Sequence, residues 1–221
     1  MSDHVHEPSL RDGAKVIAPL LPAVILFGIS FGVLARDAGM GVIAPVVMSA
    51  TTFAGSAQFA VASILDEAGG AVAAILAAIF LNARYAPMSI AAGPAFTGPS
   101  WRRFFEAQLI VDESWALAAR EGGRFERPVL LGAGLTLFPF WVGGTALGVV
   151  GGELIGDPAR LGLDAAFPAL FLALLVSQVR SHQGVAAALT GVLIALALIP
   201  VLPAGLPIVV ASAACLIGLW R

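Results

Sequence analysis

The segment that decides the fold runs from Val42 to Leu65 and reads VIAPVVMSATTFAGSAQFAVASIL. It is almost entirely apolar, yet its middle contains Gly55, Ser56 and Gln58, residues that weaken a helix or form hydrogen bonds. In hydrocarbon each unpaired backbone group costs several kcal/mol, so a broken helix persists only where protein or a water-filled cavity satisfies it. The segment therefore predicts one interrupted helix near Gly55 that faces an internal cavity.

Composition places the chain among integral membrane proteins. Of its 221 residues, 59% are hydrophobic and 12% are charged, and the mean hydropathy is +0.94. Soluble domains contain about 25% charged residues. An all-α, polytopic membrane protein is therefore expected. A span needs about 20 apolar residues. Such runs lie near residues 16–35, 42–65, 70–92, 128–150, 163–180, 184–200 and 204–220.

These runs predict about seven transmembrane helices, with an eighth if residues 104–120 also cross. That stretch is apolar but contains Glu106, Asp112 and Glu113, so it could span, dip or lie flat. With seven spans the N-terminus lies outside, and eight basic residues face the cytoplasm against three outside. With eight spans both ends lie inside, and seven basic residues face the cytoplasm against four outside. The positive-inside rule therefore favours seven spans.

The chain is expected to comprise a polar N-terminal tail, residues 1–15, and a single transmembrane domain, residues 16–221. The tail lacks the charged n-region and cleavage site of a secretory signal, so the first span must target the chain itself. Cys215 is the only cysteine, which excludes an internal disulfide and a cysteine metal site. The basic residues form no patch, which argues against nucleic acid. No metal or cofactor is expected.

A faint internal repeat relates the first three spans to the next three. Because three spans is an odd number, the two copies would be inverted, as in many secondary transporters. Chance similarity between glycine- and alanine-rich helices is the alternative. The matching elements are Pro22, Gly28 and Gly32 with Pro139, Gly144 and Gly148, and Phe53-Ala54-Gly55 with Phe167-Pro168-Ala169.

The interrupted helix is the expected substrate site. Amides at the start of its second half carry a partial positive charge, which suits a carboxylate. A polar side chain there could receive an ammonium, and flanking phenylalanines offer apolar walls. Close helix packing, with Gln58 bonding between helices, is the alternative. The expected substrate-binding residues are Phe53, Gly55, Ser56, Gln58, Phe59 and Asn82.

Three charged residues are candidates for coupling or gating. Arg84 lies inside the predicted third span, where a guanidinium costs at least about 2.5 kcal/mol and needs a partner or a water-lined cavity. Its alternative is to snorkel toward the interface. Asp112 and Glu113 could load and release a proton if they are buried. If their segment lies at the interface, they are ordinary solvated charges.

The motif Phe53-Ala54-Gly55-Ser56-Ala57-Gln58-Phe59 resembles the AzlC family, the large subunits of branched-chain amino acid exporters. Other stretches are similar to family patterns in the same order, so the likeness covers nearly the whole chain from about residue 14. These stretches are Leu21-Pro22 with Phe27-Gly28 and Phe31-Gly32, Asn82-Ala83-Arg84-Tyr85, Asp112-Glu113-Ser114-Trp115 and Phe167-Pro168-Ala169-Leu170-Phe171.

The resemblance implies a secondary transporter in the bacterial cytoplasmic membrane that exports leucine, isoleucine, valine and sometimes methionine. It also implies a small, separately encoded AzlD-type membrane partner and the membrane potential or proton gradient as driving force. Where many members are expected to have histidine, this chain has Tyr85, which argues against a proton relay at that position.

Two other functions are alternatives to transport. A serine hydrolase would need a base near Ser56, but the only downstream histidine is His182 at a helix end, so the protein is not expected to be an enzyme. A non-transporting scaffold or assembly subunit would use the glycine-rich spans for packing alone. Packing motifs do not require Gln58 or Arg84 inside the membrane, which favours transport.

Overall fold

The computed structural model describes residues 7–120, 123–155, 181–202 and 206–214, together with residues 172, 175, 176, 179 and 217. Its helices are α1 (Leu10–Ile17), α2 (Leu21–Asp37), α3 (Ile43–Thr51), α4 (Gly55–Asp66), α5 (Ala71–Asn82), α6 (Tyr85–Ala92), α7 (Ser100–Ala107), α8 (Asp112–Ala118), α9 (Arg127–Ile155), α11 (His182–Leu198) and α12 (Leu206–Ser212). Short 3-10 turns are η1 (Ala18–Leu20) and η2 (Gly93–Ala95), and a two-stranded hairpin pairs β1 (Ala119–Arg120) with β2 (Arg124–Phe125).

The described residues confirm an all-α membrane protein. Three continuous helical stretches are long and apolar enough to cross a bilayer: residues 10–37, 71–95 and 127–151. Most of the predicted span near 163–180, the Phe167-Pro168-Ala169 element and Cys215 lie outside the described residues. The exact number of spans is therefore not tested by the part of the chain that is described.

The first helical stretch begins at Leu10, six residues before the span predicted from residue 16. Ser9 and Asp12 form a capping box, in which the Asp12 carboxylate accepts hydrogen bonds from the Ser9 amide at 2.9 Å and the Ser9 hydroxyl at 2.6 Å. Helical structure thus extends into the polar segment because its serine and aspartate have cap spacing.

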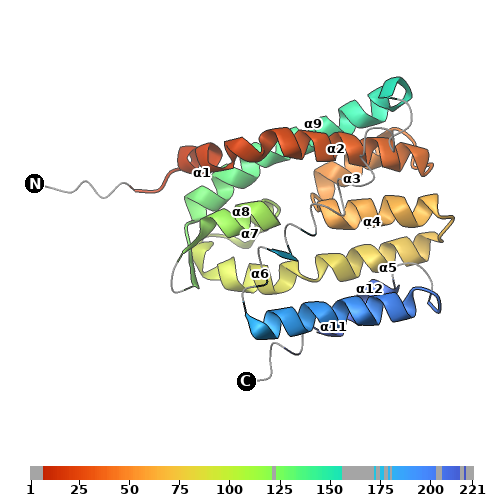
Figure 1. Cartoon of the computed structure of the whole chain (residues 1–221). Coiled ribbons are helices and arrows are strands. Elements are labelled where there is room, and N and C mark those ends of the chain that lie inside the picture. Colours follow the sequence, from red (N-terminus) through yellow and green to blue (C-terminus); the bar gives the residue numbers. More distant parts are fainter. Residues whose placement is uncertain are drawn as a thin grey trace, which may run out of the picture.

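The two longest stretches, α1–α2 and α9, lie side by side and run in the same direction (Figure 1). Glycine permits this contact: a Cβ on Gly28 would lie 2.8 Å from the Trp141 carbonyl oxygen, and one on Gly144 would lie 2.7 Å from the Ile25 oxygen. The helices of two inverted copies would run in opposite directions. The pairing of α2 with α9 therefore does not support the predicted inversion.

The interrupted helix near Gly55 is confirmed. α3 ends at Thr51, Phe53 adopts a φ of 43°, and α4 begins at Gly55. The two helices then lie next to each other, since the Gln58 amide nitrogen donates a hydrogen bond to the Ser49 hydroxyl at 2.7 Å. The predicted crossing over residues 42–65 is thus wrong: α3 enters the bundle and α4 returns to the same end (Figure 1).

The predicted third span contains a second interruption, which the sequence analysis missed. α5 ends at Asn82, α6 begins at Tyr85, and Ala83 and Arg84 form a turn between them. Pro87 is the physical cause: it has no amide hydrogen to donate to the Ala83 carbonyl, and its ring crowds that carbonyl. The two halves nevertheless continue in one direction across the molecule (Figure 1).

Residues 104–120 form no single span. They contain the end of α7 and all of α8, and helices of eight and seven residues are too short to cross about 30 Å of hydrocarbon. The connection between them, residues 108–111, enters the bundle, where Leu109 meets Gly134 of α9. The chain therefore twice forms a crossing helix followed by a hairpin: α1–α2 with α3–α4, and then α5–α6 with α7–α8. The two crossings run in opposite directions.

Because the two hairpins do not cross the membrane, the predicted orientation of the chain in the membrane changes. Among the described residues, Arg36 lies at one end of the bundle, where it donates to the Val149 carbonyl at 2.6 Å. Arg84 lies in the middle. The other seven basic residues gather at the end where α1 and α9 begin: Arg11, Lys15, Arg102, Arg103, Arg120, Arg124 and Arg127. The positive-inside rule puts that end in the cytoplasm, whereas the seven-span prediction put the N-terminus outside.

We expect Gly144→Ala to destabilise the folded protein by about 1–3 kcal/mol, because its methyl group must displace the backbone of α2. Gly143→Ala is the matched control, since nothing lies within 4 Å of a Cβ there. Thermal unfolding of the two detergent-solubilised variants is the measurement. Equal midpoints would show that the backbones of α2 and α9 are not in close contact.

Candidate functional site

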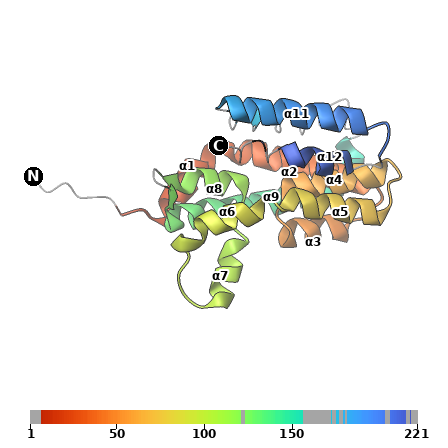
Figure 2. The ribbon, with the colours of Figure 1, turned by 90° about the horizontal axis from the view of Figure 1, so that it is seen from below.

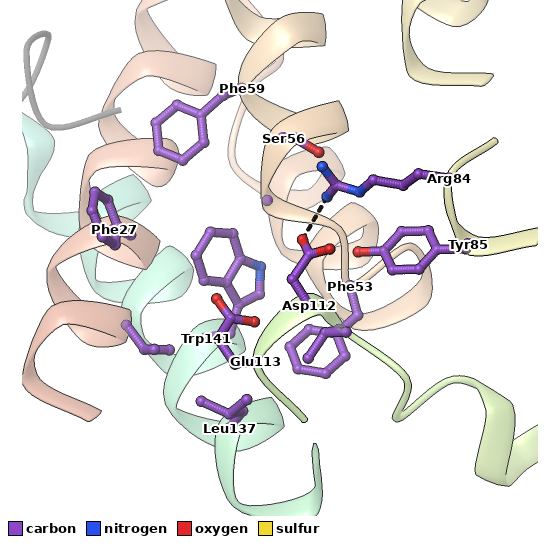
Figure 3. A pocket seen from close by; sticks show the side chains of 13 residues that line it. Phe27, Phe53, Ser56, Phe59, Arg84, Tyr85, Asp112, Glu113, Leu137 and Trp141 are labelled. Atoms are coloured by element: carbon purple, nitrogen blue, oxygen red, sulfur yellow. Dashed lines mark ion pairs between the residues drawn. The ribbon is translucent and has the colours of Figure 1, made fainter. Parts of the chain in front are cut away.

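A cavity of about 70 Å³ lies where the interruptions in the helices meet (Figure 3). At roughly 10–15 Å³ for each water, it has room for about five water molecules. Its lining comes from the α3–α4 hairpin, the α5–α6 turn, the start of α8, and the faces of α2 and α9. The lining residues are Val24, Phe27, Phe53, Gly55, Ser56, Phe59, Arg84, Tyr85, Val111, Asp112, Glu113, Leu137 and Trp141.

The start of α4 supplies one polar wall. The first amides of a helix have no carbonyl partner within it and carry the positive end of its dipole. Gly55 lets the Trp141 ring approach this turn, because a Cβ there would lie 3.2 Å from the ring. The buried Ser56 hydroxyl has no hydrogen-bond partner among the described residues and points toward Arg84 (Figure 3).

An ion pair between two interrupted elements forms the opposite wall. The Arg84 guanidinium, at the α5–α6 turn, lies 2.8 Å from the Asp112 carboxylate at the start of α8. The guanidinium also lies 5.2 Å from the centre of the Tyr85 ring, a cation–π arrangement. Its Nε is buried with no partner in the described structure. Arg84 therefore has an ionic partner and does not simply snorkel to the interface.

Glu113 is a second carboxyl group at the cavity, beside Asp112. It lines the same space, next to Trp141 (Figure 3), and forms no ion pair within the part of the chain that is described. Arg84 is already paired with Asp112, so the ionised site carries one excess negative charge. A buried charge is costly without a partner, and a cationic ligand would supply one.

Apolar side chains close the remaining sides. Phe27 of α2 and Leu137 and Trp141 of α9 face the cavity (Figure 3). Phe59 is 2% exposed and packs edge-on against Phe31, with ring centroids 5.8 Å apart. The cavity thus combines apolar walls with charged groups, a combination typical of small-molecule sites.

Seven of the nine sequence-predicted residues line the cavity, while Gln58 and Asn82 do not. Gln58 is fully buried, and its side-chain oxygen accepts from the Ala54 amide at 3.2 Å and from Trp141 Nε1 at 3.0 Å. Its amide nitrogen donates to Ser49. Asn82, two residues before Arg84, has a buried side-chain oxygen without a hydrogen-bond partner among the described residues. Gln58 thus holds the hairpin and Trp141 in place.

Sequence reasoning missed the cavity residues outside the interrupted elements: Val24, Phe27, Tyr85, Val111, Leu137 and Trp141. One signal was available for the α9 pair. Glycines at 28 and 32 and at 144 and 148 are small residues spaced by four, a pattern of close helix contact in membranes. Pairing these motifs would have brought the side chains beside them, including Phe27 and Trp141, into one region.

Gln58→Ala is expected to lower the free energy of unfolding by about 2 kcal/mol, because it leaves the Ala54 amide, the Trp141 indole and Ser49 without this partner. The matched control is Gln108→Ala, an exposed residue outside this network. Thermal unfolding and tryptophan fluorescence report the change. A stability equal to that of the control would mean that the network does not support the interruption.

Comparison with known proteins gives a consistent result. Residues 19–155 match the family model described as "AzlC protein". An uncharacterised membrane protein of Archaeoglobus fulgidus is 34% identical, over 85% of this chain and 83% of its own length. The Bacillus subtilis "Branched-chain amino acid transport protein AzlC" is 26% identical, over 83% of this chain and 73% of its own length.

The Escherichia coli "Inner membrane protein YgaZ" is also 26% identical, over 84% of this chain and 80% of its own length. No solved structure matches the chain. The membrane names of these relatives and the apolar helices together show a multi-pass membrane protein.

Proposed function

The chain belongs to the AzlC family, and on that premise we propose that it is a secondary transporter exporting branched-chain amino acids across the cytoplasmic membrane. Leucine, isoleucine and valine are the main substrates, with methionine as a further aliphatic one. The observation that carries the proposal is the central cavity, which combines an unbalanced carboxylate, a helix N-terminus and apolar walls. The named Bacillus subtilis relative supports the substrate class.

The zwitterionic head of the substrate fits the polar groups of the cavity. Its ammonium pairs with Glu113, the carboxylate that has no ionic partner. Its carboxylate accepts hydrogen bonds from the first amides of α4 and from the Ser56 hydroxyl. Gln58, first expected to receive the ammonium, keeps the helix start in position, because its own hydrogen bonds occupy it.

The apolar walls receive the branched side chain. Phe27, Phe59, Leu137 and Trp141 line the cavity together with the charged groups. A hydrophobic pocket separates side chains that differ by one methylene by only about 1–3 kcal/mol. Several aliphatic amino acids therefore share the site, whereas a second charged group in the side chain would be desolvated without a partner.

Coupling and gating belong to the Arg84–Asp112 pair together with Glu113. The pair joins the α5–α6 turn to the start of α8, so protonation of either carboxylate changes the forces between the two elements. Export draws on the proton gradient or the membrane potential. A small AzlD-type membrane subunit acts as partner, as the family membership suggests.

Glu113→Gln should weaken leucine binding by about tenfold or more, because a charge-assisted contact to the ammonium becomes a neutral one. Glu67→Gln, at the exposed end of α4, is the charge-matched control. Binding is measured by leucine-dependent thermal stabilisation of the purified protein, and export by loss of labelled leucine from cells. If leucine stabilises neither the parent protein nor the control, a scaffold role is favoured instead.

Asp112→Asn should flatten the pH dependence of export, because the variant has no titratable carboxyl at the ion pair with Arg84. Asp66→Asn, at the exposed end of α4, should retain the parent profile. Leucine efflux from proteoliposomes at a series of pH values is the measurement. A profile for Asp112→Asn that coincides with the parent would remove this carboxylate from proton coupling.

A further inference from the structure

Two further spaces lie next to the central cavity and widen toward the surface. The second has a volume of about 210 Å³, and the third is an open groove of about 850 Å³. The central cavity and the second space share Phe53 and Tyr85 in their walls. The second space and the groove share Phe104 and Gln108. The three spaces are therefore in series, from about 70 Å³ inside to the open groove.

Phe53 lies between the two inner spaces of this series. It is 7% exposed, lines both inner spaces, and packs edge-on against Phe138 with ring centroids 5.3 Å apart. Phe138 in turn lines the outer groove. The backbone of Phe53 has a φ of 43°, a conformation that costs a residue with a side chain roughly 1–3 kcal/mol. An aromatic ring is thus held between the spaces at an energetic cost.

The groove opens at the cytoplasmic end of the bundle, beside α7. Glu106 of α7 accepts hydrogen bonds from Arg127 of α9, at 3.0 Å from Nε, and from Arg102, at 2.8 Å. These two guanidiniums, Arg127 first, lower the pKa of Glu106. Positively and negatively charged side chains therefore both line the mouth of the groove. α7 has no buried residue and stands away from the helical body (Figure 2), so this ionic contact helps to hold the outer wall.

We propose that the three spaces form a cytoplasmic access route that ends in the central cavity. Phe53 is the gate residue between the second space and the central cavity. This inference rests on the proposed transport function, because it assigns the path by which the substrate reaches its site. Rotation of the Phe53 ring away from Phe138 joins the central cavity to the second space without moving a long helix.

Cysteine accessibility tests the route without any substrate. Cys215, the only cysteine of the sequence, is first replaced by serine. Ser56→Cys then reports on the central cavity and Ser89→Cys on the second space. A small, charged methanethiosulfonate reagent is applied to inside-out membrane vesicles. Residue 89 should react readily and residue 56 slowly. Adding Phe53→Ala should raise the rate at residue 56 roughly tenfold and leave residue 89 unchanged.

Phe27→Ala is the matched control, because Phe27 lines the central cavity but not the second space. It should leave the rate at residue 56 near the parent value. Phe53→Leu keeps a bulky side chain and should give an intermediate rate, which separates gating from loss of folding. Equal rates with and without Phe53→Ala, equal acceleration by Phe27→Ala, or labelling of residue 56 only from right-side-out vesicles would each overturn the gate.

Leucine protection keeps the two proposals apart. Leucine should slow the labelling of residue 56 if the central cavity is its site. Absence of protection, together with acceleration by Phe53→Ala, would refute the proposed substrate while supporting the route. Protection without that acceleration would support the substrate and refute the gate.

Discussion

The contact between the backbones of α2 and α9 is the constraint on which the rest of the architecture depends. Gly28 and Gly144 bring the two helices closer than any pair with side chains could approach, and both helices run in the same direction. Small residues of this kind drive helix association in membranes, where lipid is as apolar as the helices themselves. The pair forms a rigid wall, and the α3–α4 hairpin packs against it through the Ser49–Thr145 hydrogen bond.

The polar groups of the cavity lie where the shorter helices α3, α4 and α8 begin or end against the α2–α9 wall. Each hairpin must reverse inside the bundle, where its freed backbone groups need partners. At the α3–α4 turn, Gln58 supplies one by accepting from the Ala54 amide. At the start of α8, the Ser114 hydroxyl accepts from the Val111 amide at 3.0 Å. These internal caps leave the charged side chains of neighbouring residues free to face the space between the hairpins.

Residue types were easier to predict from the sequence than chain direction. Gly55 and its polar neighbours correctly indicated an interruption, and the depth of Arg84 indicated a partner, which is Asp112. Hydropathy cannot distinguish a broken helix that crosses from one that turns back, because both bury the same apolar surface. The basic residues of the described segments favour the opposite orientation of the N-terminus. Gln58 was assigned to substrate because two of its three partners, Ser49 and Trp141, are 9 and 83 residues away and give no local pattern.

The opposed hairpins also shape the electric field across the protein. An unbroken bundle would spread the transmembrane voltage over about 30 Å of low-dielectric material. On the proposed access route, water in the open groove would make the voltage fall across the thinner region around Phe53 and the central cavity. A full elementary charge moved through 100 mV gains about 2.3 kcal/mol. On the coupling role proposed for Glu113, a short displacement of charge there would sense a large fraction of that energy.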